Sequence, residues 1–380
     1  MDGQVFELAK SYAQDSYQEE LALLKALAVI PAPSGKEDRR AAYIRAWLNA
    51  VGCISVWTDD AQNVICQLGN PMAACYDVYS AHTDVVFDDP EPLPLVEKDG
   101  LLYAPGIGDD TACLVSLLMS AKFLAQHPEL LKDRDCGVLV VANSCEEGLG
   151  NLRGTRELYR EFGRSIHKHV TFDTYLGQMA TSAVGSHRWQ IACSCEGGHS
   201  WRDFGAPNAI VELCKLVGRL SELELPIQAR TTWNVGTISG GSTINSIAEH
   251  AEMLYEYRST DEACLSAMRE AFLGVVGEAR RDGVSMSAEC VGERPGNGNV
   301  NAAAELALET ALLDAVRTVT GEEPDCHPSS TDANIPLSMG IPAACVGTVR
   351  GGGAHTRGEW IDPTSLVDGL TLTLAIMLGT

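Results

Sequence analysis

Helical and strand-like patterns of hydrophobic residues alternate along the first half of the chain. Residues 17–29 follow a helical pattern, and a second helix is predicted to end at Gly52 after a capping box formed by Ser34 and Glu37. The continuous apolar run at 136–144 is typical of a central strand covered on both faces. The other predicted elements are an apolar helix at 111–126 and short strands at 54–57, 64–68, 77–81 and 168–173. This alternation indicates helices packed over a parallel or mixed sheet.

The pattern changes after residue 186. The segment SHRWQIACSCEGG, at 186–198, alternates apolar and polar residues like an antiparallel strand with one solvated face. Further helices are predicted at 208–220 and 261–282, and further strands at 231–241, 248–259 and 285–292. This mixture predicts an α+β insert at residues 187–291.

The segment GERPGNGN, at 292–299, is rich in Gly, Pro and Asn, as expected of a hinge that returns the chain to its first domain. The elements predicted after it are helices at 301–320 and 332–339, a strand at 342–347 and a closing apolar helix after Pro363. We therefore predict a discontinuous α/β domain, residues 1–186 and 292–380, interrupted by the insert.

Composition and charge narrow the possible partners. A chain of 380 residues exceeds the ~250–300 residues at which single cores stop growing, which supports two domains. A net charge of -23 repels nucleic-acid phosphates and anionic membranes, so neither is an expected partner. We see no signal peptide and no apolar run of the ~20 residues that a membrane helix needs. The 13 scattered cysteines, without a CxxC pair, are predicted to be reduced and mostly buried in a cytoplasmic protein.

Five polar clusters fall at predicted strand ends of the main domain, where sites collect in open α/β sheets. They are His82–Thr83–Asp84, GIGDDT at 106–111, Glu146–Glu147, Asp173 and His355. Each cluster alone has a structural alternative. A histidine at a strand end is often a core residue, and carboxylates before a helix often cap it. A glutamate pair, or a histidine beside glycines, is common in surface loops.

Together the clusters favour a metal site. If the strand ends converge, two histidines and several carboxylates share one place, and that charge density requires a cation. Borderline divalent metals take such ligands, and zinc is the leading candidate. A carboxylate near a ligating histidine can accept its second N–H, a role open to Asp84 beside His82. Of the adjacent Glu146 and Glu147, one can ligate while the other takes a proton from water.

Other chemistries fit less well. GIGDDT lacks the third glycine of a dinucleotide loop and puts two carboxylates where phosphates would lie. GTISGGST has no Walker-type lysine, and the chain contains neither HExxH nor GxSxG.

The sequence resembles the di-zinc exopeptidases and deacylases of clan MH, which include peptidase T, carboxypeptidase G, acetylornithine deacetylase and succinyl-diaminopimelate desuccinylase. SAHTDVV is similar to the His-x-Asp motif of this family, GDDTA to its Asp-Asp motif, and CEEGLGNLRG to its Glu-Glu motif. Asp173 and His355 match the two later ligands. The resemblance covers nearly the whole chain, and GGHS, STDAN and GGGAHT place it nearest a peptidase T-like branch.

The resemblance implies a phosphorylase/hydrolase-like three-layer αβα catalytic domain with a ferredoxin-like lid or dimerisation domain. It also implies two Zn²⁺ per chain, with Co²⁺ or Mn²⁺ as substitutes. One metal would bind His82, Asp109 and Asp173, and the other Glu147, His355 and the bridging Asp109. Glu146 would be the general base, and Asp84 would orient His82.

In the insert, the resemblance implies three substrate contacts. His199 would stabilise the oxyanion, often from the partner subunit, and Asn245 and Arg258 would hold a carboxylate or carbonyl of the substrate. Without the resemblance, His199 reads as a cap of the next helix and Arg258 as an exposed strand residue. One departure is Thr111, which stands where the family often has lysine.

We therefore expect a zinc-dependent metallo-exopeptidase of small peptides, of the di- or tripeptide aminopeptidase type, that forms a homodimer through the insert. One alternative is a metal-dependent deacylase of N-acyl amino acids. Another is a catalytically dead homologue that binds or scaffolds, against which the intact ligand set and Glu146 argue.

Overall fold

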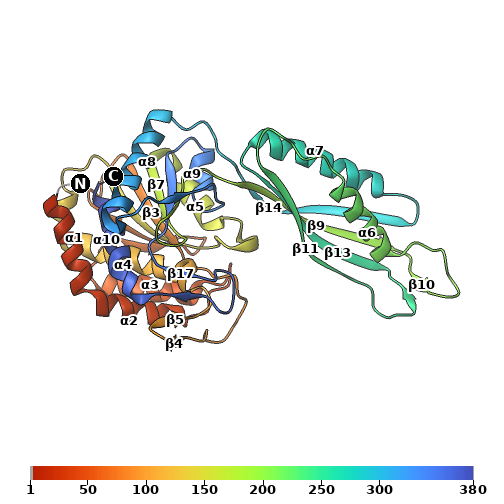
Figure 1. Ribbon diagram of the computed structural model, residues 1–380, viewed down its shortest axis with the longest axis horizontal. Helices are drawn as coiled ribbons and strands as arrows, with labels where there is room; N and C mark the ends of the chain where they lie inside the picture. The colour runs from red at the N-terminus through yellow and green to blue at the C-terminus, as the bar shows by residue number, and fades with distance from the viewer. Residues whose placement is uncertain (1–2, 380) are drawn as a thin grey trace. The chain divides into compact units, whose positions relative to one another are not determined.

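The computed structural model describes residues 3–379, which divide into two compact units (Figure 1). One unit contains the chain up to Ala183 and from Gly298 onward, and the other contains Val184–Asn297. The boundaries predicted from the sequence lie at 186/187 and 291/292. Within residues 3–379, no helix is both long and apolar enough to cross a membrane.

An eight-stranded mixed sheet forms the centre of the first unit, in the order β1-β2-β6-β3-β7-β16-β8-β15. Its strands are β1 (Val56–Thr58), β2 (Val64–Leu68), β3 (Tyr76–His82), β6 (Gly137–Asn143), β7 (Ile166–Phe172), β8 (Gln178–Ala180), β15 (Asp325–Cys326) and β16 (Ala343–Val346). The four central strands, β6, β3, β7 and β16, are parallel to one another. Their carboxyl ends therefore lie along one edge of the sheet.

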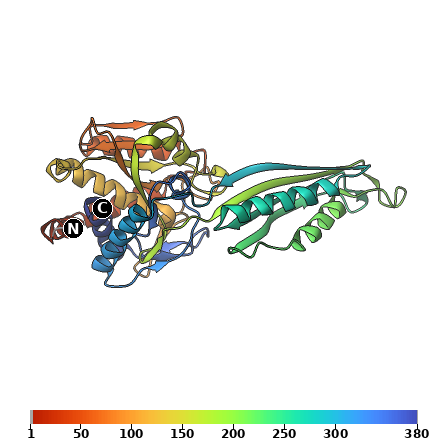
Figure 2. The ribbon, with the colours of Figure 1, turned by 90° about the horizontal axis from the view of Figure 1, so that it is seen from above.

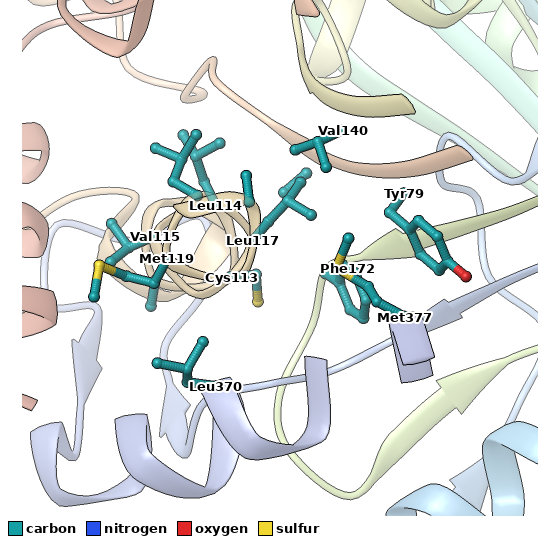
Figure 3. Packing of buried hydrophobic residues seen from close by; sticks show 14 of the residues in the cluster. Tyr79, Cys113, Leu114, Val115, Leu117, Met119, Val140, Phe172, Leu370 and Met377 are labelled. Carbon is teal, nitrogen blue, oxygen red and sulfur yellow. The ribbon is translucent and has the colours of Figure 1, made fainter. Parts of the chain in front are cut away.

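Helices cover both faces of this sheet, as the strand pattern requires. Val138, Val140 and Ala142 of β6 belong to one core, while Leu139 and Val141 belong to another on the opposite face. Figure 3 shows side chains of α4 and α10 packed beside sheet residues in the first core. The helices of this unit are α1 (Gly3–Asp15), α2 (Tyr17–Ala28), α3 (Asp38–Ala50), α4 (Cys113–Gln126), α5 (Arg153–Phe162), α8 (Ala302–Thr320), α9 (Asn334–Ser338) and α10 (Leu366–Gly379). The predicted three-layer αβα class is confirmed.

Several short elements were not predicted. A small sheet, in the order β17-β18-β5-β4, combines strands from distant parts of the chain. Its strands are β4 (Val96–Lys98), β5 (Leu101–Tyr103), β17 (Gly351–Gly352) and β18 (Trp360–Ile361). Strands of two or three residues leave too short a pattern for detection. Helix α1 was also not predicted.

The second unit has the order β9 (Gly185–Cys195), α6 (Ala209–Ser221), β11 (Thr231–Gly240), β13 (His250–Ser259), α7 (Glu262–Ala279) and β14 (Val284–Arg294). Its strands form an antiparallel sheet in the order β11-β13-β9-β14, which is the ferredoxin-like arrangement. Residues of α6 and α7 share one core with alternate residues of β9, so both helices cover the same face (Figure 2). A two-stranded ribbon pairs β10 (Gly198–His199) with β12 (Ser246–Ile247).

Two sequence predictions were wrong. Ser34 does not form a capping box with Glu37, because its hydroxyl donates a hydrogen bond to Asp84 Oδ2 at 2.6 Å. Glu37 accepts the backbone N–H groups of Gly35 at 2.9 Å and of Cys145 at 3.0 Å, and helix α3 begins only after it, at Asp38.

The cysteines are not all reduced, because Cys75 and Cys136 form a disulfide. These residues directly precede β3 and β6, which are parallel neighbours. The pairing was not apparent from the sequence because 61 positions separate the two cysteines. The other cysteines are free thiols.

Candidate active site

The predicted metal ligands come from loops at the carboxyl edge of the central strands. His82 is the last residue of β3, and Asp173 directly follows β7. Glu147 lies in the loop that follows β6, four residues after Asn143. Asp109 lies in the segment Ile107–Ala112, which leads into α4 and is not helical at Asp109 and Asp110. The fifth residue, His355, follows β17.

Asp109 lies between the two histidines. Its Oδ1 is 3.0 Å from His82 Nε2, and its Oδ2 is 3.2 Å from His355 Nε2. His355 Nε2 is also 3.3 Å from Glu147 Oε1. Donor atoms of His82, Asp109 and Glu147 all lie within 4.8 Å of one another. One carboxylate that presents an oxygen to each of two histidines has the form of a bridging ligand.

Asp173 belongs to the same electrostatic cluster but lies outside that close group of three. Burial raises the pKa of the Asp173 carboxyl well above its usual range, and the charges of Asp109, Glu146 and Glu147 raise it further. Its Oδ1 accepts the Thr174 N–H at 2.5 Å. The charged form of Asp173 is therefore disfavoured in the metal-free cluster, and a bound cation would favour it.

The pKa shifts of the other ligands point the same way. Burial, followed by the nearby charges of Asp109 and Glu146, raises the pKa of Glu147 to about 7. Hydrogen bonds to Asp109 and Glu147 raise the pKa of His355 to about 11. Burial opposes ionisation of Asp109, but hydrogen bonds from His355 and His82 outweigh it and hold the Asp109 pKa below its usual range. In the metal-free site, protons on the histidines partly compensate the negative charge of the carboxylates. Two imidazoles and three carboxylates are ligands that suit a divalent ion, which would take over this compensation.

Asp84 connects the histidine to the glutamate pair. His82 Nδ1 donates a hydrogen bond to the Asp84 backbone carbonyl at 3.1 Å and lies 3.4 Å from the carboxylate Oδ1. The two carboxylate oxygens accept the backbone N–H groups of Glu146 and Glu147, each at 2.9 Å. Burial disfavours its charge, but the contacts with His82 and the hydroxyl of Ser34 lower the Asp84 pKa below its usual value. Both the carbonyl and the carboxylate of Asp84 face His82 Nδ1, so the orienting role stays a prediction, and the carboxylate also holds the Glu146–Glu147 turn.

Glu146 and Glu147 are only 6% and 5% exposed. Glu147 faces His355, whereas the charge of Glu146 acts on Asp332. The two adjacent side chains thus have different surroundings, which allows one to ligate while the other handles a proton.

Glu359 supports the loop that carries Asp109. This buried carboxylate accepts the N–H groups of Gly106, Gly108 and Asp109 at 2.8, 2.7 and 2.7 Å. Burial raises the Glu359 pKa to about 7, although those N–H groups favour its charged form. Asp110, joined to Asp109 by a cis peptide bond, accepts the His82 backbone N–H at 2.8 Å. The sequence analysis included Asp110 in the GIGDDT cluster without a role of its own, and it did not point to Glu359.

Thr83 and Thr111, which had no role in the sequence analysis, both accept hydrogen bonds from Arg40. Its guanidinium is fully buried and donates to the Thr83 carbonyl at 2.9 Å and to Thr111 Oγ1 at 3.3 Å. Thr111 also donates to the Gly106 carbonyl at 2.6 Å. Arg40 therefore ties the loop after His82 to the loop around Asp109.

Asp332, in the STDAN segment, is a buried carboxylate that interacts electrostatically with Glu146. It accepts hydrogen bonds from Asn143 and Thr155, and burial, followed by the charge of Glu146, raises its pKa to about 7. In the sequence, STDAN indicated only the nearest branch of the family and gave Asp332 no role.

The three predicted substrate contacts lie in the second unit, and they do not come together there. His199 is in β10 and Asn245 directly precedes β12, and the Asn245 carbonyl accepts the Ser200 N–H at 3.0 Å. Arg258 lies near the other end of β13, and the eight positions from His250 to Arg258 span roughly 26 Å. Its guanidinium contacts Glu256 at 3.0 and 3.1 Å. His199 Nδ1 accepts the N–H groups of the turn that follows it.

Comparison with known proteins identifies related chains. The family model described as Peptidase family M20/M25/M40 matches residues 78–378. The acetylornithine deacetylase of Myxococcus xanthus is 27% identical over 301 residues, which is 75% of each chain. The crystal structure of aminopeptidase PepT from Bacillus cereus has a TM-score of 0.70 at 20% identity and covers 96% of this chain and 98% of that one. A dinuclear metal-binding peptidase of Bacillus subtilis has a TM-score of 0.62 at 16% identity, with 96% and 99% covered.

Proposed function

The chain belongs to peptidase family M20/M25/M40, and on this premise we propose that it is a zinc-dependent exopeptidase that hydrolyses small peptides. It is a hydrolase that acts on amide bonds, as its relatives are. The observation that carries the proposal is the position of Asp109, with one oxygen toward His82 and the other toward His355.

We propose that His82, Asp109 and Asp173 hold one Zn²⁺ and that Glu147, His355 and the shared Asp109 hold a second, with Co²⁺ or Mn²⁺ as substitutes. Such a metal pair would act as a Lewis acid toward the carbonyl of the scissile bond and make a water more acidic. The clustered carboxylates, with raised pKa values at Asp173 and Glu147, support this assignment because a cation would relieve their mutual repulsion.

In this scheme Glu146 is the general base. It takes a proton from the attacking water and delivers it to the leaving amine. Its backbone N–H is held by Asp84, which also contacts His82, so base and ligand are positioned by one carboxylate. Asp332, which accepts hydrogen bonds from Asn143 and Thr155, is close enough for the charge of Glu146 to raise its pKa.

Substrate ends would be held by the insert. We propose that Arg258 binds a substrate carboxylate or carbonyl in its own chain and that His199 and Asn245 reach the site of a partner chain in a homodimer. The roughly 26 Å along β13 from His250 to Arg258 supports this division, because the β10/β12 ribbon and Arg258 lie toward opposite ends of that strand. A cytoplasmic location remains part of the proposal.

A second candidate is a deacylase of N-acyl amino acids. It is supported by the Myxococcus xanthus relative, which is an acetylornithine deacetylase. A panel of di- and tripeptides and N-acetyl amino acids, followed by release of free amine, separates the two candidates. Faster turnover of peptides with a free amino terminus is the result we expect. Turnover of N-acetyl amino acids alone would favour the deacylase, and no turnover of either class would favour a binding homologue.

A further inference from the structure

A second group of metal-type ligands lies at the amino ends of the central strands. Cys75 directly precedes β3 and Cys136 directly precedes β6. Asp77 is the second residue of β3, and His167 is the second residue of β7. The catalytic cluster is at the opposite ends of the same strands, about 20 Å away for strands of seven residues.

These four side chains meet at one point. Donor atoms of Asp77, Cys136 and His167 lie within 4.8 Å of one another, and the sulfur of Cys75 is bonded to that of Cys136. His167 Nδ1 is 3.0 Å from Asp77 Oδ1. Two sulfurs, one imidazole nitrogen and one carboxylate oxygen form a donor set that suits tetrahedral zinc. With Zn–S bonds of about 2.3 Å, two thiolates of such a site lie about 3.8 Å apart, within the reach of this cluster.

The surroundings of Asp77 suit a ligating carboxylate. Its Oδ1 faces His167, while its Oδ2 is 3.3 Å from Lys168 Nζ and 3.7 Å from Arg134 Nη2. Carboxylate ligands in proteins are commonly held by such outer contacts. Two thiolates and Asp77 would carry three negative charges, which a divalent ion together with Lys168 and Arg134 would more than balance. His167 is exposed and Cys136 partly exposed, so an ion can reach them.

We propose that reduction of the Cys75–Cys136 disulfide creates a zinc site formed by Cys75, Cys136, Asp77 and His167. A dithiol reductant supplies two electrons and two protons, the S–S bond breaks to give two thiols, and the dithiol closes into its own disulfide. Zinc then binds both sulfurs as thiolates, and two protons are released. In the oxidised chain the sulfurs share a covalent bond and lack the thiolate charge that zinc requires. The starts of β3 and β6 are thus tied together by a disulfide in one redox state and by a metal in the other.

Cobalt binding tests this proposal separately from the catalytic site. Thiolate ligands give Co²⁺ a charge-transfer absorption in the near ultraviolet, which histidine and carboxylate ligands do not give. Protein with the disulfide intact is compared with protein treated with dithiothreitol and then freed of it without air. We expect the reduced protein to bind one more Co²⁺ per chain and to show this absorption. Its absence from the reduced protein would overturn the proposal, whatever the enzymatic activity.

Two variants identify the ligands. His167→Ala leaves the cysteines in place and removes an exposed side chain, so we expect a folded protein with Co²⁺ affinity at this site weakened at least about tenfold. His127→Ala, at a partly exposed histidine, is the matched control and should bind as the parent does. The Cys75→Ser/Cys136→Ser variant should lose the absorption. Its persistence in that variant, or an unchanged affinity in His167→Ala, would show that other residues bind the ion.

Discussion

The carboxylate of Asp84 accepts the backbone N–H of Glu146 at 2.9 Å, across 62 positions of the chain. Asp84 also contacts His82, so one fully buried side chain positions a proposed ligand and the proposed base. We predict that Asp84→Asn weakens metal affinity about 10- to 100-fold and lowers kcat, because an uncharged amide orients His82 less well. Metal titrations followed by calorimetry, with kcat measured at saturating metal, check both effects. An Asp84→Asn enzyme equal to the parent in both respects would remove Asp84 from the site.

The Glu146→Gln variant tests metal binding and catalytic turnover separately. We expect this variant to retain its metal ions and to lose about 10²- to 10⁴-fold in kcat, because the amide cannot take up a proton. Glu161→Gln, at an exposed position of α5, is the matched control and should keep full activity. Activity close to the parent value in Glu146→Gln would assign the proton transfer to another residue.

The loop that carries Asp109 should depend on Glu359. Glu359→Ala leaves the buried N–H groups of Gly106, Gly108 and Asp109 without an acceptor, and each such group costs about 1–3 kcal/mol. We predict a lower free energy of unfolding and weaker metal binding, while Glu359→Gln, which keeps one acceptor oxygen, should show a smaller loss of both. Denaturant titration of the metal-free proteins measures the first effect. If Glu359→Ala is as stable as the parent, these hydrogen bonds do not hold the loop.

Glu20, a buried carboxylate outside the site, should make the free energy of unfolding depend on pH. It is fully buried, accepts a hydrogen bond from Ser116 Oγ at 3.0 Å, and burial raises its pKa from 4.5 to about 8. Between these values the unfolded chain binds fewer protons than the folded one, so stability falls as pH rises through this range. Glu20→Gln should therefore raise the free energy of unfolding at pH ~9 by at least about 1.4 kcal/mol, the value of one pKa unit, and change it little at pH ~4. Denaturant midpoints at both pH values check this, and an equal effect at both would contradict it.

Mixed dimers test whether the insert acts between chains. His199→Ala and Arg258→Ala should each lower peptide hydrolysis strongly when made alone. A co-expressed mixture of the two should recover about a quarter of the parent activity, because half of the dimers are mixed and each mixed dimer has one intact site. No recovery of activity in the mixture would show that His199 and Arg258 of one chain act at the same active site.

The polar clusters were visible in the sequence because each follows a hydrophobic run. His82 and Asp173 end buried strands, and parallel neighbours bring their carboxyl ends to one edge, so the hydrophobic pattern alone predicts that these two residues lie close together. The alternation within β9 and β13 likewise predicted the antiparallel insert, which the structure contains.

The supporting residues could not be predicted, because their roles depend on long-range contacts. Glu359 lies 250 positions from Asp109, and nothing near it in sequence marks it as buried. Arg40 belongs to a predicted amphipathic helix, where an arginine is normally solvated, yet its guanidinium is enclosed by four carbonyl and hydroxyl acceptors. The Ser34 hydroxyl fitted a capping pattern but serves Asp84 instead.

The metal requirement is the central claim, and a stoichiometric titration tests it most directly. Chelator-treated protein with its disulfide intact is titrated with Zn²⁺, and bound metal and tripeptide hydrolysis are measured on the same samples. We predict no hydrolysis in the metal-free protein and full activity at about two bound ions per chain. Full activity of the metal-free protein in the presence of chelator would contradict the account.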